Sequence, residues 1–525
     1  MSRIKLSDFS GTDDRARFAA ALDYMKEHSG TTLFVEPGEY TITSKRARDA
    51  QQSVMNGDFG ANPEPVMFNP KYEYDRGLDF AGHCGSRVEA YGVTLMIDGF
   101  MEPISVRDCR DVEICGLTVD HVRKPYTKGI ITSYRQDGDA GYISVELCAP
   151  ITPRTPYPRS VVYNFTTGRF DIPAWIGEMT LSDPCHAEFR CDAKMESSVG
   201  NELYLWHTFH SRPVVLIENA ENTVLRDLTV HSAPGMGITA QQAKDILIER
   251  LRIIPSVGEH MSTNTDATHF ASCRGKLRLD GCEFDGQGDD SINVHTYYYT
   301  ADEYDGAKAR LSIKAPTGTH AQALDYPLAG DTLELTEKAT LNPVGKYRVL
   351  SVTPDFEKYC CHVELDRELP DDMEGYFLAD RDELPELEFV NCRARNHFAR
   401  SILIKCRRAL VENCEVSDVF DSAVKIAAEA GWHEGISSAD VTVRRCRFIN
   451  CARWSKLCGG IQVFMDCSDR TVLSHGLVTI EDNIIDCPEA EHAIIVENTR
   501  QARLARNKTN SRGDGTVIGE GVELI

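Results

Sequence analysis

Residues 261–295 read MSTNTDATHFASCRGKLRLDGCEFDGQGDDSINVH and contain two short apolar-alternating runs, 267–270 and 291–294. Positions 267 and 291 are 24 residues apart, and aspartate stands directly before each run. In a chain of stacked parallel coils, a shift of about that length places one turn of backbone over the previous one at the ~4.8 Å spacing of neighbouring strands. The pattern therefore predicts three carboxylates clustered on adjacent coils. They belong to Asp266, Asp289 and Asp290.

A pattern of one small residue followed by apolar, variable and apolar residues recurs along the chain. Seven segments share it: 237–240, 267–270, 291–294, 401–404, 423–426, 460–463 and 493–496. A second column of apolar segments keeps step with the first: 225–228, 248–251, 279–282, 411–414, 443–446 and 480–483. Strand alternation points the second and fourth positions inward and the third outward. Two repeats in step predict an all-β fold, a right-handed parallel β-helix.

The repeat is lost twice, in stretches where prolines and glycines interrupt alternating strands. Both stretches indicate inserted antiparallel, β-barrel-like modules that project near the aspartates and wall a pocket, the second more strongly because it directly follows Asp289 and Asp290. At the N-terminus, Phe18, Leu22 and Met25 share one face of a short predicted capping helix that follows Thr12 as its N-cap. The predicted divisions are a cap with first coils (1–120), an inserted module (121–212), coils carrying the aspartates (213–298), a second module (299–385) and C-terminal coils (386–525).

Composition limits the partners and the compartment. A formal net charge of −23 argues against nucleic acid, anionic membranes and polyanionic substrates. Many of the 18 cysteines fall on the repeat, which favours a ladder of small buried side chains over disulfides, and no C-x-x-C pair typical of zinc sites appears. The first residues lack an apolar signal core, so we expect a reduced cytoplasm unless a signal was removed. The oligomeric state stays open, with a homodimer as one option.

The three aspartates have a plain alternative interpretation, because aspartate often begins turns. Their combination at coil spacing favours chemistry instead. Like charges on adjacent coils push at least one carboxyl toward its protonated form while another stays ionised. A glycosidase needs that division, one acid to protonate the leaving oxygen and one carboxylate to activate water. We predict a glycoside hydrolase that acts on an oligosaccharide or glycan without metal or organic cofactor.

Further candidates share columns with the aspartates or lie on a nearby loop. Arg400 precedes Ser401 as Asp290 precedes Ser291, so it is expected either to hold Asp290 ionised and bind a sugar hydroxyl or to be a solvated rim residue. His269, Asn293 and Lys425 face outward and are candidates to bind sugar hydroxyls, although an exposed column contains polar residues anyway. The loop GWHEG (431–435) offers a sugar-stacking aromatic or a loop-packing one, and a further acid. These are Trp432 and Glu434.

The motifs TDATHF (265–270), CRG (273–275), Asp289-Asp290 and NVH (293–295) resemble the α-1,3-galactosidases of glycoside hydrolase family 110, within the pectin-lyase-like β-helix superfamily. The likeness extends more weakly from about residue 95 to 450. It implies an inverting, exo-acting α-galactosidase, with Asp289 as general acid and Asp266 and Asp290 activating water, and it adds His295 to the substrate-binding candidates. The GWHEG loop departs from the longer acidic-aromatic loop expected after Ile426.

Three alternatives remain from the residues. The Asn-Thr-Asp and Asp-Asp motifs also resemble polygalacturonases, but the basic Gly-His-Gly element of that family is missing and Lys425 stands alone where its Arg-Ile-Lys element is expected. A β-helix polysaccharide lyase typically needs Ca²⁺ or a lysine or arginine base. A non-catalytic carbohydrate-binding solenoid needs no buried carboxylate cluster. The charge of −23 favours a neutral sugar, terminal non-reducing α-linked galactose and most of all an α-1,3 linkage.

Overall fold

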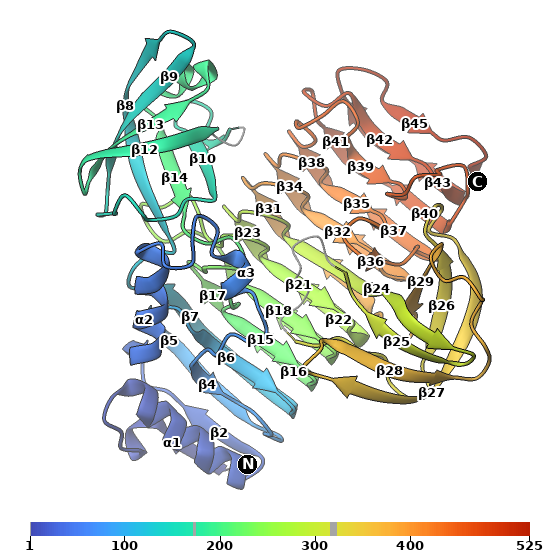
Figure 1. Cartoon of the computed structure of the whole chain (residues 1–525), viewed down its shortest axis with the longest axis horizontal. Coiled ribbons are helices and arrows are strands. Elements are labelled where there is room, and N and C mark those ends of the chain that lie inside the picture. The colour runs from blue at the N-terminus through green and yellow to red at the C-terminus, as the bar shows by residue number, and fades with distance from the viewer. Residues whose placement is uncertain (1, 172–174, 315–322) are drawn as a thin grey trace.

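The computed structural model describes residues 2–171, 175–314 and 323–525. The chain forms a parallel β-helix whose coils rise from the N-terminal cap to the C-terminus, with two insertions standing off the stack (Figure 1). Each complete coil contributes strands to three faces. The first face contains β4 (Arg76–Asp79), β6 (Glu102–Arg107), β15 (Val215–Glu218), β18 (Ile238–Gln241), β21 (Thr268–Ala271), β24 (Ile292–Asp305), β32 (Ile402–Ile404), β35 (Val424–Ile426), β39 (Gly459–Val463), β42 (His492–Val496) and β45 (Thr516–Ile518).

The other two faces join into one continuous sheet at the N-terminal end, where two long strands bend across both. The second face contains β1 (Ser2–Lys5), β2 (Thr31–Phe34), the first halves of β5 (Arg87–Asp98) and β7 (Arg110–His121), β16 (Glu221–Arg226), β19 (Lys244–Glu249), β22 (Arg274–Asp280), β30 (Glu386–Val390), β33 (Arg408–Glu412), β37 (Asp440–Arg444), β40 (His475–Glu481), β43 (Thr499–Ala505) and β46 (Glu523–Leu524). The third contains β3 (Gly38–Thr43), the second halves of β5 and β7, β17 (Thr229–Val230), β20 (Arg252–Ile253), β23 (Glu283–Asp285), β31 (Arg393–Arg395), β34 (Glu415–Ser417), β38 (Arg447–Ile449), β41 (Ile484–Asp486) and β44 (Lys508–Asn510).

The strand register agrees with the repeat predicted from the sequence. Thr268 pairs with Ile238 on one side and Ile292 on the other, and Ile292 pairs with Ile402 across the second insertion. The same column continues through Val424, Ile461 and Ile494. The predicted β-helix is therefore confirmed, together with the alignment of all seven segments.

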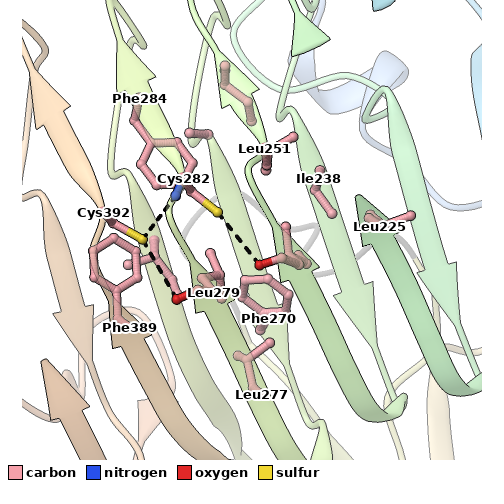
Figure 2. Close-up of a cluster of buried hydrophobic side chains, with 14 of the residues drawn as sticks. Leu225, Ile238, Leu251, Phe270, Leu277, Leu279, Cys282, Phe284, Phe389 and Cys392 are labelled. Atoms are coloured by element: carbon pink, nitrogen blue, oxygen red, sulfur yellow. Dashed lines mark hydrogen bonds between the residues drawn. The ribbon is translucent and has the colours of Figure 1, made fainter. Parts of the chain in front are cut away.

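The interior of the coil is a continuous apolar core in which inward side chains stack on the same positions of neighbouring coils. Figure 2 shows part of it, where Cys282 and Cys392 lie one above the other between phenylalanines and leucines. The backbone N–H of Cys282 donates to the Cys392 sulfur at 3.4 Å, and the N–H of Cys414 donates to the Cys446 sulfur in the same way. All 18 cysteines lie among the described residues and are free, as the predicted ladder requires.

Each coil turns from the second face to the third through one residue in the left-handed conformation. The φ angle is +57° at Asp227, +52° at Arg250, +66° at Gly281, +56° at Asn391 and +54° at Asn413. Only Gly adopts this region freely, with Asn and Asp the next most tolerant, and all of these bend residues except Arg250 are of those types. The residue after the bend returns to the core, and that position holds the cysteine ladder.

The N-terminal helix α1 (Asp14–Glu27) plugs the open end of the stack, burying Phe18, Leu22 and Met25 as predicted. Its N-cap is Asp13 rather than Thr12, because the Asp13 carboxylate accepts the N–H of Ala16 at 2.8 Å. Three further short helices near the N-terminus were not predicted from the sequence: η1 (Leu6–Asp8), which precedes α1, and α2 (Lys45–Met55) and α3 (Glu64–Met67), which follow it.

The two insertions differ in architecture. The first is an open antiparallel sheet in the order β11-β10-β14-β8-β9-β13-β12, so it is not the barrel-like module that was predicted. Its strands are β8 (Tyr126–Asp137), β9 (Ala140–Leu147), β10 (Arg159–Asn164), β11 (Arg169–Phe170), β12 (Ile176–Asp183), β13 (His186–Cys191) and β14 (Glu202–Trp206), with η2 (Ala193–Ser198) between the last two. Because β11 and β12 each pair on one side only, the sheet has two free edges.

The second insertion closes on itself. Pairing runs β24-β25-β28-β27-β26-β29 and returns to β24, which makes a six-stranded antiparallel barrel as predicted. The strands beyond β24 are β25 (Lys308–Ser312), β26 (Thr332–Glu337), β27 (Pro343–Asp355), β28 (Cys360–Leu365) and β29 (Tyr376–Asp380), and β36 (Glu434–Gly435) pairs with β24 from outside the barrel. Over the described ranges, no helix has the length and apolar character needed to cross a bilayer.

Candidate active site

The three aspartates lie at the turn that leads into the first face of the coil. Asp266 precedes β21, and Asp289 and Asp290 precede β24. The N–H of Ala267 donates to the carbonyl of Asp290 at 2.8 Å, which places Asp266 and Asp290 on adjacent coils in one column. One oxygen from each of the three carboxylates lies within 4.8 Å of the others. The structure thus brings the predicted aspartates together.

Arg400 lies on the next coil of the same column and binds one aspartate of the three. Its guanidinium donates to Asp290 Oδ2 at 2.9 Å and its backbone N–H donates to Asp290 Oδ1 at 3.0 Å. Burial raises the pKa of Asp290, an increase that Arg400 opposes and that Asp289 and Asp266 reinforce. Burial and the Asp266 charge also raise the pKa of Asp289, with Arg400 and Arg159 opposing.

Three carboxylates around one arginine do not all ionise, so a proton is retained in the cluster. Two charge-assisted bonds from Arg400 favour the ionised form of Asp290. Asp289 receives no side-chain hydrogen bond from the described residues and is the member of the cluster that lines a cavity. Burial raises the pKa of both Asp289 and Asp290, and Asp289 is the carboxyl that faces the open side of the cluster.

Asp266 is tied to a pair of buried histidines. His269 Nδ1 lies 2.7 Å from Asp266 Oδ2, and His269 Nε2 lies 2.8 Å from His295 Nε2. Burial lowers the pKa of His295 to about 4, so His295 is neutral near pH 7, and its Nδ1 donates to the Thr296 carbonyl at 3.1 Å. Its Nε2 then accepts from His269, which leaves one proton between His269 Nδ1 and Asp266.

A buried lysine lies behind the histidines. Lys405 is fully buried and forms ion pairs with both Glu429 and Glu434. Burial opposes ionisation of Glu434, but His295 and Lys405 hold the pKa of that carboxyl well below its usual range. Glu434 also accepts from Asn293 Nδ2 at 3.2 Å. This network fixes the surroundings of Asp266 without reaching the cavity.

A cavity of about 600 Å³ opens in front of Asp289, between the first insertion and the coil. The insertion supplies Arg159 and Trp206, and turns of three coils supply Asp289, Phe398 and Asp421. Other lining side chains are Tyr157, Pro158, Ser160, Val161, Trp175, Ile176, Phe420 and Trp454. The sequence favoured the second insertion as the stronger wall, but the open sheet of the first insertion lines this cavity and the barrel does not.

None of the predicted substrate-binding side chains lines this cavity. His269, Asn293, His295, Arg400 and Glu434 are held in the networks behind the aspartates. The outward column was expected to be exposed, yet its residues are buried, since β36 and the barrel segments cover that side of the first face.

Two predicted residues lie elsewhere. Lys425 is 8% exposed and donates to Asp421 Oδ2 at 2.9 Å, so it reaches the cavity only through that carboxylate. Trp432 is 48% exposed on the GWHEG loop and does not line the cavity.

Sequence analysis missed the aromatic wall. Three of the four tryptophans of the chain, Trp175, Trp206 and Trp454, line the cavity together with Phe398 and Phe420. The scarcity of tryptophan was a usable signal. The repeat could not place these residues because they lie in turns and in the insertion, outside the aligned columns.

Two groups in the site have metal-ligand types. Asp266, Asp289 and Asp290 form one, and His269, His295 and Glu434 form the other, each with one ligand atom per residue inside 4.8 Å. In both groups some of the donors are already occupied by an internal cation or hydrogen bond: Arg400 on Asp290, and the 2.8 Å contact between the two imidazoles. The donor sets are better explained by proton sharing than by coordination.

Comparison with known proteins agrees with the resemblance seen in the sequence, although no family model matches the chain. Alpha-1,3-galactosidase A of Bacteroides fragilis is 26% identical over 457 residues, covering 82% of this chain and 74% of that protein. Alpha-1,3-galactosidase B of Bacteroides thetaiotaomicron is 22% identical over 493 residues, covering 85% and 75%. This chain is homologous to curated α-1,3-galactosidases. The resemblance to these enzymes is thereby confirmed.

Solved structures are more distant. The catalytic domain of a GH87 α-1,3-glucanase in complex with nigerose aligns with a TM-score of 0.44 at 8% identity, covering 100% of this chain and 67% of that one. The A-module of a mannuronan C-5 epimerase from Azotobacter vinelandii aligns with a TM-score of 0.41 at 10% identity and covers 99% of both chains.

The burial of Lys405 between two glutamates leads to a prediction about the stability of the fold. Lys405→Met leaves Glu429 and Glu434 buried without their cation, and we expect the free energy of unfolding to fall by about 3–5 kcal/mol. Chemical denaturation measures it. The matched control is Lys276→Met, which removes a half-exposed lysine paired with Glu388 and costs about 0–1 kcal/mol. Equal losses in the two variants would contradict the structural role of Lys405.

Proposed function

We propose that this protein is an exo-acting glycoside hydrolase that removes terminal non-reducing α-linked galactose, with α-1,3 as the linkage. The observation that carries the proposal is Asp289, whose carboxyl faces an aromatic-lined cavity with the carboxyls of Asp266 and Asp290 directly behind it. The relatives named as α-1,3-galactosidases supply the sugar and the linkage.

Asp289 fits the role of general acid. Its raised pKa keeps the proton at a pH where an ordinary aspartate has lost it, and its carboxyl is the one in the cluster that contacts the cavity. A glycosidic oxygen bound there receives the proton as the bond to the anomeric carbon breaks, so the departing sugar leaves as a neutral alcohol. Activity that depends on this acid falls as the pH rises through the pKa of Asp289.

Asp266 and Asp290 fit the role of water activators. Both are 5% exposed or less and neither lines the cavity, so a water molecule reaches the sugar more readily than either carboxylate does. The water gives its proton to this carboxylate pair as its oxygen bonds to the anomeric carbon. Direct displacement by water inverts the anomeric configuration.

The spacing of the carboxylates, by contrast, favours a retaining mechanism. Oxygens within 4.8 Å are close to the ~5–5.5 Å separation typical of retaining enzymes rather than the ~6.5–9.5 Å of inverting ones. The side chains converge instead of splaying apart, as the sequence argument for inversion had assumed. We place more weight on the burial of Asp266 and Asp290, because a retaining nucleophile must touch the sugar.

Charge favours a neutral sugar over a galacturonate. Among the lining residues Asp289 and Asp421 are acidic and Arg159 is basic, and the guanidinium of Arg159 already lies 3.4 Å from the centre of the Phe209 ring. Arg400 and Lys425 are committed to Asp290 and Asp421. A uronic acid would therefore face little uncompensated positive charge, and a lyase would lack a free basic residue beyond Arg159. Apolar rings suit the flat faces of an uncharged sugar.

Removal of the acid is the first test of the mechanism. Asp289→Asn keeps the shape of the side chain and removes the proton donor, so we expect kcat to fall about 10³-fold while the protein folds and binds galactose as before. The alkaline limb of the pH profile should disappear with it. Steady-state kinetics on a nitrophenyl α-galactoside from pH 4 to 9 measures both effects.

The control for that variant is Asp418→Asn, a change outside the cavity at a left-handed residue (φ +56°) that asparagine also tolerates. It should keep the activity of the unchanged protein. Comparable kcat values for Asp289→Asn and Asp418→Asn would remove Asp289 from the acid role.

The stereochemical prediction is separate. Proton NMR of the first sugar released should show β-galactose, because water attacks the face opposite to the departing group. Initial formation of α-galactose would instead assign Asp289 or a neighbour as a nucleophile in a double displacement.

The substrate prediction compares two sugars in one assay. Galactosyl-α-1,3-galactose should be cleaved to galactose at low and high salt alike, whereas polygalacturonate should not be hydrolysed at either. Release of galacturonate without action on the α-galactoside would move the protein to the polygalacturonase-like alternative. Binding of either sugar without hydrolysis would favour a carbohydrate-binding solenoid.

A further inference from the structure

A second cavity, of about 740 Å³, lies between the barrel and the C-terminal coils. The barrel contributes residues from β26, β27 and the segment after β29, and the coils contribute the starts of β33, β40 and β43. Figure 1 places β26 and β29 beside β40 at that end of the molecule. The cavity has no lining residue in common with the active-site cavity.

Positive charge dominates this second cavity. Five basic side chains line it against one acidic side chain, Glu334. Glu334 pairs with Arg407 and, at 3.5 Å, with Arg381. The remaining three have no ion-pair partner among the described residues: Lys346, Arg408 and Arg500. These three side chains are exposed to solvent at the cavity and are available to an anion, in a chain whose net charge is −23.

Buried polar atoms on the cavity wall also lack partners. Ser438 is 2% exposed, and its hydroxyl forms no hydrogen bond with the described residues. Arg407 Nε is likewise buried and unsatisfied, while its Nη1 donates to the carbonyl and hydroxyl of Ser437 at 2.8 and 3.2 Å. Buried donors are normally satisfied, so the wall of the cavity holds polar groups that its own side chains do not pair.

Burial lowers the pKa of Arg407, and although Glu334 opposes that shift, the neighbouring Arg381 adds to it. An anion between these groups would relieve both effects. Arginine forks form paired bonds with oxyanions, and serine hydroxyls donate one further bond each. A group with two negative charges and several oxygens matches five cations and two serines better than a carboxylate does.

We propose that this cavity binds a tetrahedral oxyanion, a sulfate or phosphate group, through Lys346, Arg408 and Arg500, with the positive charge of Arg407 behind them. The group has two chemical sources, a free inorganic ion or an ester on a sugar. The proposal does not rest on the hydrolase assignment, because the cavity is separate from Asp289 and its neighbours.

Isothermal titration of the full chain tests the site with sodium sulfate and sodium phosphate, using sodium chloride at equal ionic strength as the reference. We expect saturable binding of one oxyanion per chain. The variant Arg408→Ala/Arg500→Ala should weaken it by about 10-fold or more for each arginine, since each removes a charge-assisted bond. Arg407 is left intact because its pair with Glu334 helps to hold the barrel against the coil.

The matched control is Arg393→Ala, an exposed arginine without an ion-pair partner in the described part of the chain and outside the cavity. It should bind the oxyanions as the unchanged protein does. Circular dichroism and the thermal midpoint verify that each variant is folded. Binding no tighter than chloride, or equal binding by the double variant, would overturn the proposal.

Titration with sugar esters distinguishes a free inorganic ion from an ester group on a sugar as the source of the oxyanion. Glucose 6-phosphate and N-acetylglucosamine 6-sulfate are titrated with excess galactose present to occupy the active site. Tighter binding of an ester than of its inorganic ion assigns the site to modified glycans, and equal or weaker binding assigns it to the free ion. Loss of α-galactosidase activity has no bearing on these titrations, so the two proposals fail independently.

Discussion

The register of the stacked coils is the constraint on which the site depends. Side chains alternate across each strand, so a slip of one residue would carry the whole apolar set out of the core. The inward positions of β21, β24 and β32 pair in step, and this alone places Asp266, Asp290 and Arg400 in a vertical column. The chemistry is thus positioned by a core of leucine, isoleucine and cysteine that never touches the substrate.

Electrostatic balance is the second requirement. The column places acidic and basic groups alternately: the Asp266 carboxylate meets His269, Asp290 meets Arg400, and Lys405 meets Glu429 and Glu434. Among the three clustered aspartates, Asp289 is the one that forms no ion pair or side-chain hydrogen bond with the described residues. A carboxyl left out of this pairing has no hydrogen-bonded cation to favour its ionised form, which sets Asp289 apart from the two neighbours of the same residue type.

Much of this arrangement could be predicted from the sequence, and the limits have physical reasons. The columns of Asp266, Asp290 and Arg400 follow from periodicity, because a solenoid makes neighbours of residues at a fixed offset. The burial of the outward-facing side chains could not be predicted from periodicity, because it depends on where β36 and the barrel fold back over the first face. Arg159 and Trp206 were missed for the same reason, as the open sheet that carries them has no offset relating it to the coil. Glu434, predicted to meet the sugar, is a partner of Lys405.

Strand β24 belongs to both the coil and the barrel, and this has a consequence for how the chain assembles. Its first residues pair with β32, yet Ser291 and Ser401 are 110 positions apart, whereas β21 and β24 pair across a single coil. Closing the longer loop costs about 1.3 kcal/mol more in chain entropy if the intervening residues are unstructured. Hairpins such as β26 with β27 involve only local contacts, so a barrel that forms early shortens the effective loop. The order of events would then run from the insertion to the stack, with the C-terminal coils added to a platform that the barrel has already brought into reach.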